Sequence, residues 1–314
     1  MEEPRFTAKE QVSCVCTPAD AHDAADVVNP NGAGMQSLFL GLTAALLWGM
    51  HDFILRRLGP RVDALPMLFV SLVSGIILLG TVTAIDGGFN ILTTDTILIA
   101  LAAGFFYALG CLALYRAFAI GPVRLVAPLC GSYPALSVLF AIYGGNAVTV
   151  SVWASVAVII AGIALVARGE KDSPSGKVGI AVLWSGCAAL GFALTFAFAQ
   201  TSAEQGDALA ASSVTRFGAI LVIGALLLAR RAALGPAKSI WRTLVVMGAI
   251  DVTAMTLVAL AGRFPNPEIA AITSSIFGLI TILLAMVFLG EKVRPVQWLG
   301  VLAVFGGVVV LGMG

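Results

Sequence analysis

Apolar stretches of about twenty residues follow one another along most of the chain, separated by short polar segments. A helix that crosses the roughly 30 Å hydrocarbon core of a bilayer needs about that length. The pattern therefore predicts ten membrane-spanning helices. The predicted spans are residues 36–56, 65–85, 96–118, 121–143, 149–168, 178–200, 208–229, 241–262, 267–289 and 295–313.

Some of the breaks between spans are very short. Only Ile120, Gly121 and Pro122 separate the third and fourth spans, and the Gly-Pro pair supplies the break. Residues 263–267 separate the eighth and ninth spans at the corresponding place in the second half. The only long polar break after the N-terminal segment, residues 169–177, links the two halves, 36–168 and 178–314.

The second half repeats the first after about 144 residues. Gly104, Ala117 and Ala127 recur as Gly248, Ala261 and Ala271, and after a one-residue slip Gly145, Trp153 and Gly162 recur as Gly290, Trp298 and Gly307. Units with an odd number of spans insert in opposite orientations and enclose a site near the bilayer midplane, as in many secondary transporters. The predicted fold class is an all-α polytopic membrane protein with a five-plus-five inverted repeat, which favours solute transport over catalysis.

Composition supports a bilayer environment. Of the 314 residues, 59% are hydrophobic and 11% charged, too few polar residues to cover a soluble globule of this size. A net charge of +1 gives no sign of a nucleic-acid partner. Cys111, Cys130 and Cys187 lie within predicted spans, where packing suits them. Cys14 and Cys16 lack the spacing and companions of a zinc site, so we expect no metal and no cofactor.

Residues 1–34 are polar and contain no apolar run of signal-peptide length. Their composition predicts a disordered tail. Because Met35 directly precedes the first span, an extension from an earlier start site stays open as an alternative.

Positive charge lies mainly on one side of the predicted spans. The residues on that side are Arg56, Arg57, Arg61, Arg116, Arg124, Arg168, Lys171, Lys177, Arg230, Arg231, Lys238, Arg242, Lys292 and Arg294. The other side has Arg263 and, in the tail, Arg5 and Lys9. Because cytoplasmic loops carry an excess of Lys and Arg, both termini are predicted to lie outside.

Three short motifs give the chain a family resemblance. They are Leu47-Trp48-Gly49 in the first span, Tyr115-Arg116-Ala117 continuing to Pro128, and Leu289-Gly290-Glu291-Lys292 after the ninth span. With these motifs, residues 36–314 resemble the ten-helix EamA-like branch of the drug/metabolite transporter superfamily. The resemblance implies a carrier of small metabolites such as amino acids or nucleobases, with a cavity lined by the first four spans of each half. We expect it in a bacterial inner membrane, as a monomer or homodimer.

The chain departs from a symmetric pair of copies. The first copy has Gly145 and Asn146 where the second has Gly290 and Glu291, and no residue of 70–74 matches Arg216. The predicted outside termini also differ from the cytoplasmic termini drawn for many relatives.

Ionisable side chains within the hydrocarbon are costly unless they face a partner or a polar cavity. Asp251 lies at the centre of the eighth span, and Arg216 lies about one helical turn away in depth. Asp251 is a candidate for binding a proton or a substrate amine, and Arg216 for binding a substrate carboxylate or tuning Asp251. A permanent ion pair between two helices is the structural alternative.

Further cavity candidates lie in the third and first spans. Tyr107 is 144 residues before Asp251 and is either a cavity phenol or an aromatic core residue. Trp48 either walls the cavity or fills space between helices. His51 could sense or relay protons, since histidine titrates near neutral pH, or be merely interfacial. Asp52 could pair with Arg56 at i, i+4 spacing.

Polar and helix-breaking residues cluster in the fourth and ninth spans, which can kink and present backbone groups to a cavity. Ser132, Tyr133, Thr273 and Ser274 are the candidates there, and close helix packing is the alternative for the small residues. Glu291 is interpreted as a loop cap or ion-pair partner rather than a substrate ligand.

Two other classes of protein fit the sequence less well. An intramembrane serine hydrolase would need Ser132 with His51 as base, and no second motif supports it. A channel or receptor would usually need an oligomeric pore or a repeated filter, and neither pattern is visible. Without an ATP-binding loop, energy would come from an ion gradient, with protons as the candidate ion, or from exchange.

Overall fold

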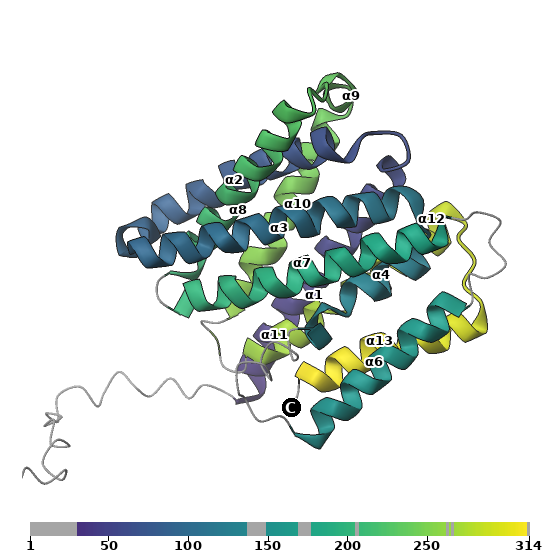
Figure 1. The fold of residues 1–314 in the computed structure, drawn as a ribbon. Helices are drawn as coiled ribbons and strands as arrows, with labels where there is room; N and C mark the ends of the chain where they lie inside the picture. The colour runs from purple at the N-terminus through teal and green to yellow at the C-terminus, as the bar shows by residue number, and fades with distance from the viewer. Residues whose placement is uncertain are drawn as a thin grey trace, which may run out of the picture.

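The computed structural model describes residues 30–136, 149–168, 177–204, 207–261, 264 and 267–312 (Figure 1). Over these residues the regular secondary structure is entirely helical. The helices are α1 (Pro30–Leu58), α2 (Ala64–Asp86), the 3-10 helix η1 (Gly88–Ile91), α3 (Thr94–Ile120), α4 (Val123–Gly131), α6 (Val150–Arg168), α7 (Val178–Glu204), α8 (Ala208–Ala229), α9 (Gly235–Lys238), α10 (Trp241–Ala261), α11 (Pro267–Ser274), α12 (Phe277–Leu289) and α13 (Pro295–Gly312).

Seven of the described helices are long and apolar enough to cross a membrane, namely α1, α2, α3, α6, α7, α8 and α10, and α12 and α13 are shorter apolar helices. Large apolar side chains on their outer faces are exposed, Ile85 by 83% and Leu228 by 77%. The predicted class of all-α multi-pass membrane protein is confirmed. The count of ten crossings stays a prediction, because the description of the fourth span stops at residue 136.

The first helix begins earlier than expected. α1 starts at Pro30, six residues before the predicted start of the span, so the helix includes residues 30–34. Proline favours the first turn of a helix because its missing N–H has no partner there. Residues 1–29, and the linker from 169 to 176, lie outside the described residues.

Local sequence signals fix several helix ends. Asp63 and Asp207 are the N-caps of α2 and α8, and their carboxylates accept hydrogen bonds from the N–H groups of Leu65 and Ala210. These two aspartates are 144 residues apart, so the cap recurs with the repeat. The predicted break at Gly121 and Pro122 is also present, since Gly121 is extended and ends α3.

Each half packs against the other through equivalent helices. α3 packs on α7 and α8, and its counterpart α10 packs on α1 and α2. Two helices pack on their own counterparts, α2 on α8 and α6 on α13, and the α6–α13 pair lies at one edge of the bundle (Figure 1). Such reciprocal contacts are those of an approximate two-fold arrangement, in which each copy uses the same surface.

Glycines at equivalent positions let the two copies approach closely. A Cβ on Gly104 would collide with the backbone of α8 at Thr215, and a Cβ on Gly248 would collide with α2 at Ser71 and Ser74. Thr215 is 144 residues after Ser71, so the two contacts are the same contact made twice. Small residues at such positions allow helix backbones to touch. In a membrane this close packing helps to hold helices together, because the hydrophobic effect does not drive helix association in lipid.

The fourth and ninth spans, which were predicted to kink, are both interrupted; the ninth is divided into α11 and α12. Ser132 (φ −83°, ψ 2°) follows α4, and Ile276 (φ −77°, ψ 1°) separates α11 from α12. These residues are again 144 apart, and the N–H of each binds the carbonyl three residues earlier at 3.4 Å. Pro134 has no N–H with which to continue the first helix. Phe305 of α13 packs against Gly131 and Gly278, beside the two breaks.

Candidate functional site

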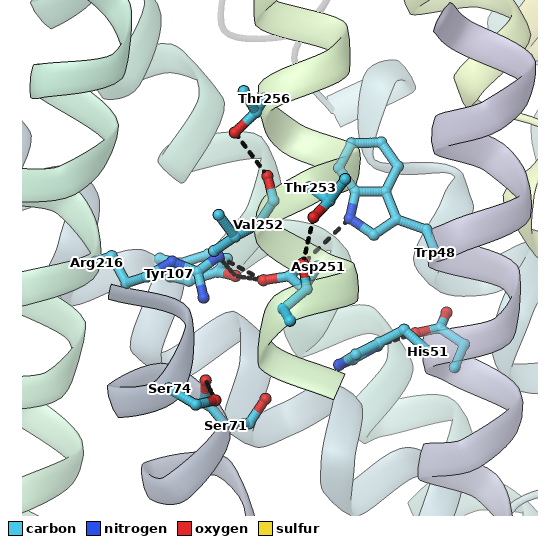
Figure 2. Close-up of polar contacts among 12 residues, drawn as sticks. Trp48, His51, Ser71, Ser74, Tyr107, Arg216, Asp251, Val252, Thr253 and Thr256 are labelled. Atoms are coloured by element: carbon cyan, nitrogen blue, oxygen red, sulfur yellow. Dashed lines mark hydrogen bonds and ion pairs between the residues drawn. The ribbon is translucent and has the colours of Figure 1, made fainter. Parts of the chain in front are cut away.

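A buried ion pair lies at the centre of the helix bundle. Arg216 of α8 donates a hydrogen bond from Nη2 to Oδ2 of Asp251 on α10 (Figure 2). Arg216 is 2% exposed, and the Asp251 side chain is 18% exposed. The sequence placed the two residues within reach by depth alone, and the structure brings them into contact. Two opposite charges satisfy each other here inside the apolar part of the chain.

Two further donors complete the surroundings of the Asp251 carboxylate. Trp48 of α1 donates from Nε1 to Oδ1 at 3.0 Å, and Tyr107 of α3 donates from its hydroxyl to Oδ2 at 3.2 Å. Arg216 also lies 3.4 Å from the Tyr107 hydroxyl, and its guanidinium lies 5.7 Å from the Tyr107 ring centroid. Figure 2 shows Asp251 between Arg216 on one side and Trp48 on the other. Four predicted site residues from four helices therefore form one hydrogen-bonded cluster, which we call the Asp251 cluster.

The Asp251 cluster lies where the two copies meet. Tyr107 and Asp251 are equivalent positions of the repeat, 144 residues apart, and their side chains touch. Equivalent residues can touch only close to the axis that relates the two copies, because the distance between them grows with their distance from that axis. The cluster is therefore near-symmetric in position and asymmetric in chemistry, with a phenol on one side and a carboxylate on the other.

Two equivalent pairs of aromatic rings lie beside the Asp251 cluster. Trp48 packs edge-on against Phe277 with a 6.0 Å centroid separation, and Phe192 packs edge-on against Tyr133 at 6.4 Å. Phe192 and Phe277 are the equivalents of Trp48 and Tyr133, respectively. Phe192 also lies 6.4 Å from the Tyr107 ring. The residues that follow the two helix breaks, Tyr133 and Phe277, thus place rings beside the Asp251 cluster.

Sequence reasoning missed Phe192 and Phe277, because a phenylalanine in an apolar span carries no polar signal. The repeat offset was the signal that could have found them. Applying 144 residues to Trp48 and Tyr133 gives these two positions directly.

A second buried polar pair lies one helical turn along α1. His51 Nδ1 is 3.1 Å from Asp52 Oδ1, and the two residues are 7% and 5% exposed. The expected i, i+4 pair of Asp52 with Arg56 is replaced by this contact. Arg56 instead donates from Nε to Glu291 at 3.1 Å and from Nη1 to the Phe118 carbonyl at 2.8 Å.

Glu291 joins three segments at the end of α1. Besides accepting from Arg56, it accepts a hydrogen bond from the Val123 N–H at the start of α4 at 2.9 Å, and Arg124 lies 3.9 Å from Oε2. Gly290 reaches this position through a left-handed turn with φ 65°, which favours glycine. The capping and ion-pairing interpretation of Glu291 fits this geometry. Its first-copy counterpart, Asn146, lies outside the described residues.

Two of the hydroxyls proposed for the fourth and ninth spans, those of Ser132 and Thr273, bind backbone carbonyls of their own segments. Ser132 donates to the Leu129 carbonyl at 2.7 Å, and Thr273 donates to Ile269 at 2.7 Å. Thr273 also packs against Gly41 of α1, which fits the close-packing alternative. Ser274 is buried. The Tyr133 ring packs against Phe192, which in turn lies beside Tyr107.

The geometry gives no support to the hydrolase alternative. Ser132 bonds its own helix and His51 bonds Asp52, so no hydrogen bond joins Ser132 to His51 among the described residues. In the same part of the chain, no group of three His, Cys, Asp or Glu side chains could hold a metal ion.

An apolar hollow of about 440 Å³ lies at the start of α1. Its lining residues are Met35, Gln36, Phe39, Leu40, Leu260 and Phe264. The nearest of these on α1 is eight residues before Trp48, about 12 Å along the helix. The hollow is therefore separate from the Asp251 cluster.

An all-helical, multi-pass fold with an ion pair at the junction of two repeats is typical of a membrane transporter. The sequence profile of the EamA-like transporter family matches the chain twice, at residues 35–168 and 179–313. The chain belongs to the EamA-like transporter family, and the predicted resemblance is confirmed.

Other comparisons support the fold. A solved structure described only as "Crystal structure of protein" aligns with a TM-score of 0.61 and 15% identity, over 88% of this chain and 96% of that one. At this identity the similarity shows a shared fold and no more. No curated protein matches the chain significantly.

Proposed function

We propose that the chain is a secondary transporter that moves a small organic metabolite across the membrane by alternating access, with export or exchange coupled to protons. The observation that carries the proposal is the contact between Tyr107 and Asp251 at the junction of the copies, with Arg216 as the ion-pair partner. Transporters with inverted repeats bind their substrates at this junction, near the midplane.

The proposal includes ten crossings arranged as two five-helix units of opposite orientation. The reciprocal helix contacts and the repeated N-caps support two equivalent units. Five crossings per unit would reverse the second unit relative to the first. The clustering of Lys and Arg on one side supports outside termini in a bacterial inner membrane.

The Asp251 cluster suits a substrate that carries charge. A substrate amine would compete with Arg216 for the Asp251 carboxylate, and a substrate carboxylate would compete with Asp251 for the Arg216 guanidinium. The aromatic rings of Trp48, Phe192 and Phe277 offer apolar surface beside these charges. An amino acid with an apolar side chain combines both features, and a nucleobase would instead use its flat face against the rings and its polar edge against the charged groups. The ion pair would then be a resting contact that substrate opens, and not a permanent link between helices.

A thermal-shift screen of the purified protein tests this function. Amino acids, nucleosides, sugar phosphates and quaternary amines are compared on the wild type and on Asp251→Asn. A ligand at a hundred times its Kd stabilises by about 2.7 kcal/mol, so a hit should raise the melting temperature of the wild type and not of the variant. The hit should then show counterflow in proteoliposomes. Hits that stabilise both proteins equally would contradict the assignment of the site.

A further inference from the structure

We propose that His51 and Asp52 form a binding site for one exchangeable proton, separate from the Asp251 cluster. This inference deepens the proposed function, on which its role in coupling rests. It starts from the placement of the pair on α1. Trp48, Asp52 and Arg56 follow at i, i+4 and i+8 on one helix face, so the His51–Asp52 pair lies between the Asp251 cluster and the Glu291 contacts. Figure 2 shows His51 one turn from Trp48.

Without an added proton, the His51–Asp52 pair would carry a net negative charge inside the bundle. Arg216 and Asp251 neutralise each other. Neutral His51 beside ionised Asp52 would leave an uncompensated negative charge among groups that are at least nine-tenths buried. One added proton, on the carboxylate or on the imidazole, makes the pair neutral overall. The pair therefore binds a proton at low electrostatic cost and releases it when another positive group approaches.

The geometry of His51 suits proton exchange. Its Nδ1 faces the Asp52 carboxylate, while its Nε2 has no hydrogen-bond partner among the described residues. Histidine is the side chain whose ordinary titration falls nearest neutral pH. A ring held on one nitrogen by a carboxylate and free on the other can take up or give a proton to water at the free nitrogen.

Groups on α3, α8 and α10 lie near this pair. Tyr115 of α3 lies with its ring centroid 6.3 Å from that of His51. The charged groups Asp251 of α10 and Arg216 of α8 lie one turn away along α1, where Asp251 accepts a hydrogen bond from Trp48. A substrate that separates Arg216 from Asp251 would change the field at His51. This is a physical route by which substrate binding could release the proton.

The pair exists in one copy only. The positions 144 residues after His51 and Asp52 are Thr195 and Phe196, and the Thr195 hydroxyl bonds the Gly191 carbonyl at 2.7 Å. Neither of those side chains can bind a proton near neutral pH. The proposal is therefore one such site, and one proton, per chain.

Histidine-selective NMR of the purified full chain tests the site directly. The chain has two histidines, His22 and His51, so isotope-labelled histidine gives two signals, and His22→Gln assigns them. The signal of His51 should titrate reversibly between about pH 5 and pH 8. In Asp52→Asn, His51 should bind its proton at least about tenfold more weakly, because a charge-assisted hydrogen bond is lost. Asp95→Asn, on an exposed residue of α3, is the matched control and should leave the titration unchanged.

The conservative Asp52→Glu keeps a carboxylate and should retain the titration if Asp52→Asn fails to fold. A His51 signal that stays in one state across this pH range, or that titrates alike in wild type and Asp52→Asn, would overturn the proton site. Neither result would bear on the substrate screen, because the titration needs no substrate. Conversely, a titrating pair in a protein that fails every transport test would leave the proton site standing and refute the transport proposal.

Discussion

The two copies of the repeat share a scaffold and differ in charge. Asp63 and Asp207 cap equivalent helices, Gly104 and Gly248 make the same close contact, and Ser132 and Ile276 break equivalent helices. Apart from these capping aspartates, the charged groups that form ion pairs are not shared. Asp251 faces its counterpart Tyr107, Arg216 stands where the first copy has Leu72, and Glu291 stands where it has Asn146.

This difference separates what builds the fold from what performs its function. Positions that contact backbone or end helices tolerate few residue types, so both copies keep similar chemistry there. Charges inside a membrane cost free energy, so a charge that is present in only one copy is a candidate for function. The four predictions below test this division by giving one copy the chemistry of the other or by perturbing the shared scaffold.

Loss of the Asp251 charge should have the largest effect on transport. We expect Asp251→Asn to lower transport of the compound found by the screen by roughly a hundredfold, since each charge-assisted hydrogen bond contributes about 1.5–3 kcal/mol. The measurement is the initial rate of counterflow in proteoliposomes. Asp95→Asn serves as a control that should transport normally. Wild-type rates in Asp251→Asn would remove this residue from the mechanism.

Giving the second copy the Leu72 side chain of the first should unbalance the ion pair. We expect Arg216→Leu to destabilise the protein by about 3–5 kcal/mol, because it leaves the Asp251 carboxylate buried without its cation. The double variant Arg216→Leu/Asp251→Asn should recover at least half of that loss while remaining inactive in transport. Denaturation of the two variants measures both values. Equal stability of the single and double variants would show that the pair is not electrostatically coupled.

Filling the shared glycine contacts should affect both copies alike. We expect Gly104→Ala and Gly248→Ala each to destabilise by about 1–3 kcal/mol, because the added Cβ collides with backbone. Gly186→Ala and Gly306→Ala are controls, since a Cβ there meets nothing within 4 Å. They should stay within about 0.5 kcal/mol of the wild type. A large effect in only one copy would argue against equivalent packing.

Replacing Glu291 with its counterpart should have the smallest effect. Glu291→Asn loses the Arg56 pair and a bond from the Val123 N–H, for which we expect about 1–2 kcal/mol in thermal denaturation, weaker in high salt. The reverse change, Asn146→Glu, should leave stability within about 0.5 kcal/mol. The equivalent of Val123 is Pro267, which has no N–H to donate. A gain from Asn146→Glu would contradict this explanation.

Much of the fold was predictable because its signals are local. Apolar length located the described spans, Gly121 and Pro122 marked a break, and the repeat matched each helix of one half to its equivalent in the other. The interruption at Ile276 was not predicted as a break between two helices, because no proline stands there and small residues in the span are equally typical of packing. The early start of α1 was missed because polar residues at the end of a helix look like a tail.

The candidate site was predictable only in part. Depth alone placed Arg216 within reach of Asp251, since both charges stand out in apolar sequence. The contact of Arg56 with Glu291 joins residues 235 apart in sequence, and no repeat relation links them. The exchange of partners at Asp52, from Arg56 to His51, depends on how α1 rotates against its neighbours, which the sequence pattern does not specify.

The account depends most on the opposite orientation of the two copies, which cysteine labelling measures directly. Arg57 near the end of α1 and Thr201 near the end of α7 are exposed and equivalent, 144 residues apart. Each would be changed to cysteine in a variant without other cysteines and treated in intact cells with a membrane-impermeant thiol reagent. We expect labelling of Thr201→Cys from outside, and labelling of Arg57→Cys only after the membrane is opened. Labelling of both positions from the same side would mean parallel copies and would contradict the account.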